Sequence, residues 1–482
     1  MEKYLLLLFL SCCGAFTICG AQTVTVRGRV IDRKTGEVLS DANVADLVLG
    51  TGVATNSYGL YSIHVKSKQC ILRCSMLGYA TKIDTLTLAV NMVHDFALMP
   101  DNYQLNDVEI VGERKFGGQL ALTQKEIQSF PTLGSEPDVL KSLQYLPGVI
   151  SGNEGTNNIS VRGSDQWGNL VLLDEAMVYN PNHALSFFSV FNNDAIQQVN
   201  LYKSYFPLMY GGRTSSVIDV RMREGNNQEK HRSATIGVIA SKLQLEGPIK
   251  RGKTSYLLST RFAYPGAILG VLERFRGTKM NFYDINAKIN STLNDRNRFF
   301  FSIYNGGDHT YFNQLVRGYG MNWGNTTATF RWNHVLTDKT SGNLSAIFSN
   351  YYYRYKSMAD GMKYLWKSNM QSYQLKYDVD YAFSNMLHIK SGLSGHTFTI
   401  MPGGIDNWGD LNNVVPYRMN RRRLLDIAAY GEISYEISPR WQFNGGIRLS
   451  TIYSPKVSTY KQKCYVCLLY TSDAADEARS VD

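Results

Sequence analysis

Strict alternation of apolar and polar residues dominates the chain beyond residue 225. The clearest stretch runs from residue 373 to 383, with apolar Tyr373, Leu375, Tyr377, Val379, Tyr381 and Phe383 alternating with Gln374, Lys376, Asp378, Asp380 and Ala382. A period of two is the pattern of a β-strand whose two faces meet different surroundings. The same period recurs around Phe330 and around Ile433. The repetition predicts a large antiparallel sheet in the second half of the chain.

The charged positions indicate which face of these strands meets which surroundings. Lys376, Asp378 and Asp380 share one face, while the opposite face is aromatic and aliphatic. Charged side chains are costly in a lipid bilayer, so they are expected to face a wet lumen. The strands of a soluble β-sandwich also alternate between apolar and polar residues, so a single strand does not distinguish a sandwich from a membrane barrel. Repeated strands with aromatic ends predict a transmembrane β-barrel.

The connections between these strands also alternate. Short polar turns at 247–253, 294–296, 337–339, 384–385 and 438–440 are interleaved with long segments at 266–279, 306–324, 357–368 and 401–423. Short periplasmic turns and long outer loops are typical of outer-membrane barrels. About ten strands fit between residues 226 and 466 by this count.

Aromatic side chains in the predicted outer loops are candidate ligand contacts. They combine an apolar ring with a polar tip, which suits binding of a sugar or a peptide. Exposed loops of barrels often carry such residues without binding a ligand. Ligand contact and an ordinary loop residue are therefore both open interpretations. The candidates are Tyr311, Tyr319, Trp323, Trp366 and Trp408.

Residues 22–100 predict a small β-domain. Period-two alternation is interrupted by turn signals at 32–37 and 55–59, which gives about seven short strands and the spacing of an immunoglobulin-like sandwich. Cys70 and Cys74 lie four residues apart on one predicted strand, hence on one face and about 13 Å apart, too far for a disulfide. We expect two small buried side chains there.

Residues from about 113 to 225 change to a mixed α/β pattern. A short amphipathic helix is predicted from Ser135, as its N-cap, to Leu146, before Pro147-Gly148. A strand is predicted at 169–174, a helix near 194–198, and strands at 199–202 and 216–220. This segment is therefore expected to be a separate α/β domain.

Composition and the N-terminus narrow the class of protein. Of 482 residues, 44% are hydrophobic, 19% charged and 12% aromatic, which excludes a disordered chain. No apolar run after residue 21 is long enough for a membrane helix, which excludes a polytopic helical membrane protein. The net charge is +10, but the basic residues are scattered along the chain, so no nucleic-acid partner is indicated.

Residues 1–21 predict a secretory signal peptide, with lipidation at Cys12 or Cys13 as the alternative.

No catalytic, metal or cofactor motif is found. The chain has 8 His residues but neither an H-E-x-x-H nor a G-x-S-x-G sequence, so we predict neither an enzyme nor a resident cofactor. Cys464 and Cys467 form a C-x-x-C pair, yet no second pair exists to complete a zinc site. The remaining expectations are a transport or a binding function.

The N-terminal domain resembles a known module. Its turns and strands contain Gly28-x-Val30-x-Asp32, Thr35-Gly36-Glu37 and Gly59-x-Tyr61-Ser62. In these features, residues 22–100 resemble the carboxypeptidase-regulatory-like domain found at the N-terminus of many Bacteroidetes outer-membrane receptors. The name of that domain implies no peptidase activity.

The linker at 101–115 is similar in place and composition to the TonB box of TonB-dependent receptors. Its candidate residues are Asp107, Val108, Glu109, Ile110 and Val111. An extended segment with free backbone edges can be captured by strand addition, which suits a handle pulled by a periplasmic partner. The alternative is that these residues form the last strand of the sandwich.

The segment 116–225 resembles the plug domain of these receptors. Four short motifs occur in the family's order, namely Leu146-Pro147-Gly148-Val149, Val161-Arg162-Gly163, Leu173-Asp174 and Gly211-Gly212-Arg213. We hypothesise that Arg162 and Arg213 hold the plug to the barrel wall by ion pairs, the alternative being solvated loop residues. The end of the segment differs from receptors that pair with starch-binding lipoproteins, so a lipoprotein partner is unsupported.

Size arithmetic suggests that the barrel is incomplete. Ten strands close to a diameter of roughly 20 Å, whereas a plug of about 110 residues is roughly 34 Å across. About 22 strands would give roughly 44 Å. We therefore expect the chain to end about halfway through its barrel. Residues 467–482 resemble a translated transposase adapter used in library sequencing, which removes Cys467 from consideration as a site.

The fold class expected is mainly β, with an immunoglobulin-like sandwich, an α/β plug and about 10 of about 22 barrel strands. The resemblance implies a TonB-dependent receptor in the outer membrane of a Gram-negative cell, with a periplasmic N-terminal domain. It would import a siderophore, glycan, cobalamin or peptide, with a TonB-type protein, outer-membrane lipid and the small ligand as partners. The alternative is a secreted or surface β-rich adhesin or carbohydrate-binding protein, which leaves the plug motifs unexplained.

Overall fold

The computed structural model describes residues 24–66, 69–101, 119–131, 136–152, 156–313, 318–359, 362–407, 415–438, 441–454 and 464–468. Two compact units are present, Met1–Ile31 with Val38–Leu98 and Asp32–Glu37 with Met99–Asp482. Among the described residues, no helix is long and apolar enough to cross a membrane. The predicted signal peptide, the segment 107–111, Trp408 and the residues after 468 lie outside the described part of the chain.

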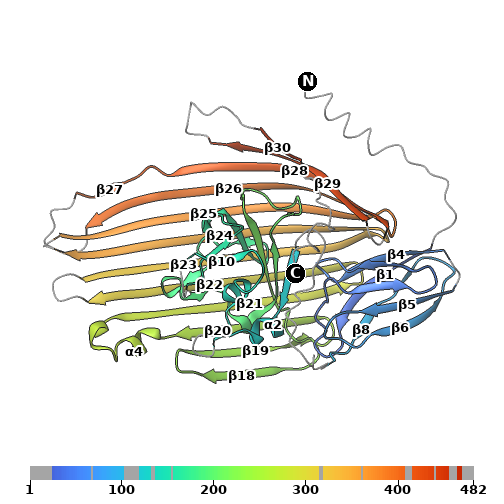
Figure 1. The fold of residues 1–482 in the computed structure, drawn as a ribbon, viewed down its shortest axis with the longest axis horizontal. Helices are drawn as coiled ribbons and strands as arrows, with labels where there is room; N and C mark the ends of the chain where they lie inside the picture. The colour runs from blue at the N-terminus through green and yellow to red at the C-terminus, as the bar shows by residue number, and fades with distance from the viewer. Residues whose placement is uncertain are drawn as a thin grey trace, which may run out of the picture. The chain divides into compact units, whose positions relative to one another are not determined.

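The first unit is a sandwich of two four-stranded sheets, coloured blue in Figure 1. One sheet contains β4 (Leu60–Val65), β1 (Val24–Asp32), β7 (Met92–Val93) and β8 (Phe96–Leu98); the other contains β3 (Thr51–Ala54), β2 (Asn43–Asp46), β5 (Gln69–Ser75) and β6 (Lys82–Thr87). Alternate residues of both sheets form one apolar core. Cys70 and Cys74 are fully buried free thiols in this core, as predicted. Burial raises the pKa of the Cys74 thiol to about 12, so it is unreactive.

The second unit begins with the domain that we call the plug, the described residues of 119–225. Its five-stranded sheet has the order β13-β12-β17-β16-β9, with β12 parallel to β17 and the other pairs antiparallel. The strands are β9 (Gln119–Thr123), β12 (Asn169–Leu173), β13 (Ala176–Met177), β16 (Ile196–Tyr202) and β17 (Ser216–Met222). Helices α2 (Gln124–Ser129) and α3 (Val139–Leu143) contribute to the plug core.

Short elements complete the plug. They are two hairpins, β10 (Val149–Ser151) with β11 (Ile159–Val161) and β14 (Asn182–His183) with β15 (Phe188–Ser189), and the 3-10 turns η2 (Gln166–Gly168), η3 (Ala184–Ser186) and η4 (Asn193–Ala195).

Two predicted helices of the plug are corrected by the structure. Helix α3 begins at Val139, not after Ser135, because the Asp138 side chain accepts hydrogen bonds from the backbone of Leu140 and Lys141. The helix predicted at 194–198 is only the turn η4, and strand β16 starts at Ile196. Pairing of β16 with both β9 and β17 outweighs the local helical pattern.

The remainder of the second unit is one large sheet, which we call the wall. It has 13 strands among the described residues, compared with the ten predicted. They are β18 (His231–Ile236), β19 (Ala240–Lys250), β20 (Thr254–Ala263), β21 (Lys279–Asn294), β22 (Asn297–Asn313), β23 (Gly318–Thr337), β24 (Thr340–Ala359), β25 (Met362–Ala382), β26 (Leu387–Asn407), β27 (Tyr417–Arg418), β28 (Arg422–Ser438), β29 (Trp441–Tyr453) and β30 (Cys464–Leu468). Each pairs antiparallel with its neighbours in chain order, except that β27 pairs only with β26 and β26 continues to β28.

The strands of the wall are longer than predicted. Strands β23 and β24 have 20 residues and β25 and β26 have 21, whereas a membrane crossing needs about 9–11. The predicted outer loops at 306–324 and 357–368 are therefore mostly strand, because unbroken pairing continues through their Asn and Gly residues. The segment 266–279 is an irregular connection with helix α4 (Pro265–Leu269) and the turn η5 (Glu273–Phe275).

The two faces of the wall differ as the alternation predicts. On β25, Lys376 is 4% exposed, while Tyr373 and Leu375 are 56% and 58% exposed on the opposite face. The plug packs against the face that carries Lys376, which we call the inner face (Figure 1). The polar set faces the plug and the apolar set faces outward.

Candidate functional site: the plug and the inner face of the wall

Two adjacent carboxylates of the plug bind basic residues of three wall strands. Asp174 and Glu175 form the tight turn between β12 and β13, where both have positive φ, 45° and 73°. The carboxylate of Asp174 lies 2.9 Å from Nζ of Lys288 on β21. Glu175 lies 3.1 Å from the guanidinium of Arg331 on β23 and 3.0 Å from Nζ of Lys376 on β25. The turn thus ties the end of the plug sheet to the wall.

Burial and charge act in opposite directions on these carboxyl groups. Burial by itself would raise the pKa of Asp174 and of Glu175. The positive charges of Lys288, Arg331 and Lys376 outweigh burial and hold both pKa values below their usual range, that of Glu175 far below it. Both groups are ionised at neutral pH, and removal of one partner would leave a buried charge uncompensated, at a cost of about 3–5 kcal/mol.

A second contact joins the plug hairpin β14–β15 to strands β20–β22. Nδ1 of His183 lies 2.5 Å from the Asp308 carboxylate, and Nε2 lies 2.7 Å from Asp284. Asp284 also accepts from Arg261 at 2.5 Å and from the Tyr304 hydroxyl at 2.8 Å. Both imidazole nitrogens donate only when the ring is protonated. Burial by itself would lower the pKa of His183, but the two carboxylates raise it to about 9.

The residues that follow His183 have unfavourable backbone conformations. Ala184, Leu185 and Ser186 have positive φ values of 47°, 58° and 75° in succession. Each such residue costs roughly 1 kcal/mol without a glycine. The Ala184 N–H donates to Asp308 at 2.7 Å, so the same carboxylate holds both the imidazole and the strained backbone.

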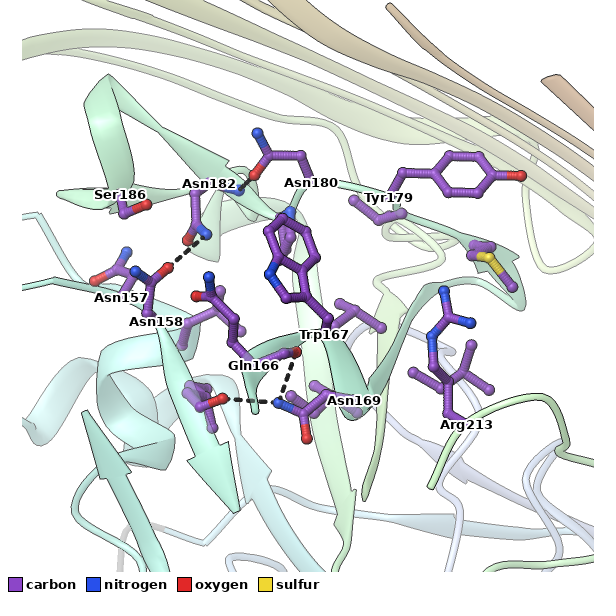
Figure 2. A pocket seen from close by; sticks show the side chains of 18 residues that line it. Asn157, Asn158, Gln166, Trp167, Asn169, Tyr179, Asn180, Asn182, Ser186 and Arg213 are labelled. Atoms are coloured by element: carbon purple, nitrogen blue, oxygen red, sulfur yellow. Dashed lines mark hydrogen bonds between the residues drawn. The ribbon is translucent and has the colours of Figure 1, made fainter. Parts of the chain in front are cut away.

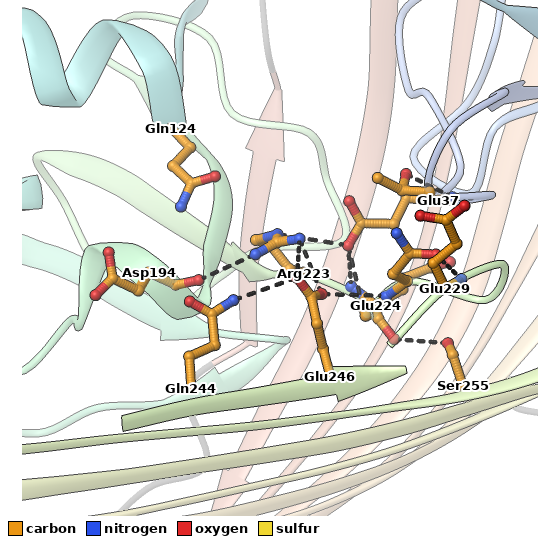
Figure 3. A network of polar contacts seen from close by, with 12 residues as sticks. Glu37, Gln124, Asp194, Arg223, Glu224, Glu229, Gln244, Glu246 and Ser255 are labelled. Atoms are coloured by element: carbon orange, nitrogen blue, oxygen red, sulfur yellow. Dashed lines mark hydrogen bonds and ion pairs between the residues drawn. The ribbon is translucent and has the colours of Figure 1, made fainter. Parts of the chain in front are cut away.

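A third set of contacts lies at the C-terminal end of the plug (Figure 3). The Arg223 guanidinium lies 2.9 Å from Glu246 on β19 and 3.7 Å from Glu37, which belongs to the same compact unit. Glu224 lies 3.0 Å from Arg298 on β22. Burial raises the pKa of Glu37, and the charge of Arg223 opposes this shift. The chain therefore leaves the plug through a buried, charge-paired segment.

Strands β28 and β29 hold the plug on the other side. Glu432 accepts from the Tyr205 hydroxyl and, at 2.9 Å, from the backbone N–H of Leu208. Arg448 donates to the Leu208 carbonyl at 2.9 Å. The polar contacts between plug and wall thus involve strands from β19 to β29.

The plug also contains a cavity of about 200 Å³ (Figure 2). Its polar lining is mostly amide side chains, together with Tyr179, Ser186, Arg213 and Trp167, which is 66% exposed. The carbonyl oxygens of the Asn157 and Asn182 side chains are buried without a hydrogen-bond partner among the described residues. The lining amides are Asn157, Asn158, Gln166, Asn169, Asn180 and Asn182.

Of the predicted plug motif residues, Asp174 forms an ion pair with the wall. Arg162 instead donates to Ser204 of the plug at 2.5 Å, and Arg213 donates to the Gly212 carbonyl at 3.0 Å and lines the cavity. Within the described part of the chain, neither arginine has an ion pair with the wall. Among the described residues, carboxylates of the plug and cations of the wall supply the ion pairs instead.

The glycines of these motifs have structural roles. Gly163 and Gly212 have φ values of 74° and 79°, which favour glycine. A side chain at Gly211 would lie 2.7 Å from Nε of Arg448, so the guanidinium needs this space.

The four predicted ligand aromatics that the structure describes are on strands and not in loops. Trp323 is 5% exposed, and its Nε1 donates to the Asn182 carbonyl at 3.1 Å. Tyr319 and Trp366 are half-buried at inner-face positions of β23 and β25. Tyr311 has the opposite parity from Asp308 on β22, so it lies on the outer face. Trp408 is outside the described residues.

Sequence reasoning missed Glu175 and His183. The alternation placed Arg331 and Lys376 on the lumen face, but their partners lie more than 150 residues away in the chain, and no local pattern pairs them. Within the described ranges, no group of three or more His, Cys, Asp or Glu residues is arranged to hold a metal ion.

Comparison with known families identifies two modules. Residues 26–110 match the CarboxypepD_reg-like domain, and residues 120–217 match the TonB-dependent Receptor Plug Domain. The chain therefore contains a carboxypeptidase-regulatory-like domain and a TonB-dependent receptor plug domain, as the sequence motifs predicted. No curated protein matches the sequence.

Solved structures share the fold. BauA, the ferric preacinetobactin receptor of Acinetobacter baumannii, has 11% identity and a TM-score of 0.55, and the match covers 75% of this chain and 62% of BauA. The copper transporter OprC has 11% identity and a TM-score of 0.56, with coverage of 72% and 58%. FpvA of P. aeruginosa, solved with an iron-pyoverdine complex, has 11% identity and a TM-score of 0.57, with coverage of 75% and 56%. The chain thus spans about three fifths of these proteins.

Proposed function

We propose that this chain acts as a TonB-dependent receptor of the outer membrane, which imports a small nutrient ligand with energy from the inner membrane. The observation that carries the proposal is the plug itself, held by buried ion pairs to the polar face of a sheet whose other face is apolar. A secreted adhesin has no need of such a domain. The N-terminal domain would lie in the periplasm.

The contacts between plug and wall suit a domain that must move. Ion pairs and hydrogen bonds can exchange their partners for water when the plug shifts, whereas an apolar interface would expose surface at a continuing cost. The strained residues after His183 lower the free energy needed to open that hairpin locally. We infer that pulling on the plug separates such contacts one after another.

The partner that pulls would capture the segment 107–111. A TonB-type protein can add an extended strand to its own sheet through backbone hydrogen bonds. The ligand cannot be inferred from the fold alone, since the similar structures include a ferric preacinetobactin receptor and a copper transporter. No resident cofactor is part of this proposal.

The experiment is a capture assay. The full chain is extracted from outer-membrane fractions in detergent, and its binding to the immobilised periplasmic domain of a TonB-type protein is measured. A Val108→Pro and Ile110→Pro double variant removes two backbone donors and is expected to lose capture. A Lys115→Pro variant in the same linker is the matched control and is expected to keep it. Equal capture of all three proteins, or a chain found only in the soluble fraction, would contradict the proposal.

A further inference from the structure

A continuous row of aromatic rings crosses the outer parts of strands β22–β25, beyond the plug. The ring centroids of Phe312 and Tyr319 are 4.9 Å apart. Those of Tyr319 and Tyr355 are 6.4 Å apart, and those of Tyr355 and Tyr364 are 6.2 Å apart. The row therefore passes from strand to strand without a gap.

This row lies on the inner face of the wall. Trp323 contacts the plug through Asn182, and Tyr319 is four residues away on β23, hence on the same face and about 13 Å farther along. Trp366 is directly opposite Tyr355 in the register of β24 and β25 and shares its face.

Trp366 has a dedicated space against the wall. A side chain placed on Gly403 would come within 2.0 Å of the Trp366 ring, so the ring packs over the glycine. The register of β25 and β26 shifts beside this position, between Lys367 and Asn369. Bulges of this kind re-aim neighbouring side chains.

The outer part of this face carries no cation on β23, β24 or β25 among the described residues. From Trp323 outward, its positions hold Tyr319, Met321, Tyr351, Tyr353, Tyr355, Ser357, Tyr364, Trp366, Ser368 and Met370. The basic residues of the same strand segments, Arg354, Lys356, Lys363 and Lys367, all have the parity of the outer face. An anionic ligand would find no cationic partner among the described residues of this outer part of the three strands.

The amide-lined cavity of the plug adjoins the same surface. The backbone carbonyls of Asn180 and Asn182 accept from Asn325 at 2.7 Å and from Trp323 at 3.1 Å. The unpaired side-chain oxygens of Asn157 and Asn182 are acceptors, so they require donors. Among the described residues that line the cavity, Arg213 is the one basic side chain.

We propose that the aromatic row and the amide cavity form one binding surface for an uncharged, polyhydroxylated ligand, a neutral oligosaccharide. Aromatic rings stack against the C–H faces of sugars, and hydroxyl groups supply the donors that the amide oxygens lack. This inference rests on the proposed receptor function and names the class of its ligand. It gives no role to negative charge on the ligand.

The experiment measures binding of the detergent-solubilised full chain to an array of neutral oligosaccharides and, separately, to an iron(III) tris-catecholate. Saturable binding to neutral oligosaccharides is expected. Trp366→Ala and Tyr319→Ala should each weaken it by about tenfold, and Gly403→Ala, which displaces the Trp366 ring, should also weaken it. Tyr373→Ala removes an exposed ring from the outer face and is the matched control, with affinity unchanged.

Each other outcome overturns the inference. Binding of the iron chelate with no oligosaccharide binding would keep the receptor and refute this ligand class, as would binding of neither probe. If Tyr373→Ala weakens oligosaccharide binding as much as Trp366→Ala does, the assignment of the binding surface to the inner face is refuted. Capture by the TonB-type protein tests the receptor function separately, so the two failures are distinguishable.

Discussion

The inner face of strands β23–β25 is divided into two halves of different chemistry. The half that contacts the β12–β13 turn of the plug carries Arg331 and Lys376, each paired with Glu175. The half beyond the plug carries Tyr319, Tyr355 and Trp366 and no cation among its described residues. On the inner face, the described cations of these three strands thus lie only where the plug supplies the opposite charge.

This difference separates two tasks of one surface. Buried charges without partners are costly, so they specify where the plug must sit. An uncharged aromatic surface specifies no single position and remains available to a ligand. The predictions below test the two halves against each other.

The largest effect is expected in the charged half. Glu175→Gln keeps the shape of the side chain but leaves Arg331 and Lys376 short of a buried negative charge, which should destabilise the plug by about 3–5 kcal/mol. Hydrogen exchange of peptides from β12 and β17 measures this as loss of protection. Glu229→Gln, at an exposed carboxylate after the plug, is the control, and equal protection in both variants would refute the role of Glu175.

A pH effect of intermediate size is expected at the hairpin β14–β15. The folded-state pKa of His183 is raised from 6.5 to about 9, so its contribution is complete below about pH 6.5 and is lost as pH rises through about 9. The loss should be on the order of 2–3 kcal/mol. Hydrogen exchange at a series of pH values should show this slope in the wild type and in His309→Gln, an exposed histidine of β22, but not in His183→Gln. A slope that persists in His183→Gln would contradict the assignment.

A charge inserted into the aromatic half should have a smaller effect. Tyr355→Lys loses two ring contacts but places its ammonium group on a half-exposed surface, so the stability cost should be about 1 kcal/mol or less. Plug protection should remain at the wild-type level. A loss as large as that of Glu175→Gln would show that the two halves do not differ in the way described.

The smallest effect is expected at Arg213. Its guanidinium donates only to the neighbouring Gly212 carbonyl among the contacts seen, so Arg213→Ala should change plug protection by less than about twofold. The same peptides of β12 and β17 provide the measurement. A large loss would support the hypothesis that this arginine holds the plug to the wall.

Alternation in the sequence is sufficient to predict the faces of the wall. Lys376 and Tyr373 were assigned to opposite faces from period two alone, and their exposed fractions agree. Strand ends were not predictable in the same way. Asn and Gly residues around 306 and 324 suggest a loop, but neighbouring strands supply pairing partners throughout, and the ladder continues. Tyr319 and Trp366 were therefore placed in loops although they lie on strands.

The partners within the candidate site could not be predicted from local patterns. Motifs such as Val161-Arg162-Gly163 locate the plug, since they mark its tight turns. They do not show that Glu175, one residue beyond a motif, meets cations on β23 and β25. His183 carries no local signal at all, because its two carboxylates lie more than 100 residues away.

The most direct test of the account is a double-mutant cycle between Glu175→Gln and Arg331→Met, with the free energy of plug opening measured by hydrogen exchange. The account predicts that each single variant is strongly destabilised and that the double variant recovers part of the loss, with a coupling of about 2 kcal/mol or more. Additive effects within about 0.5 kcal/mol would contradict the claim that buried charges hold the plug to the wall.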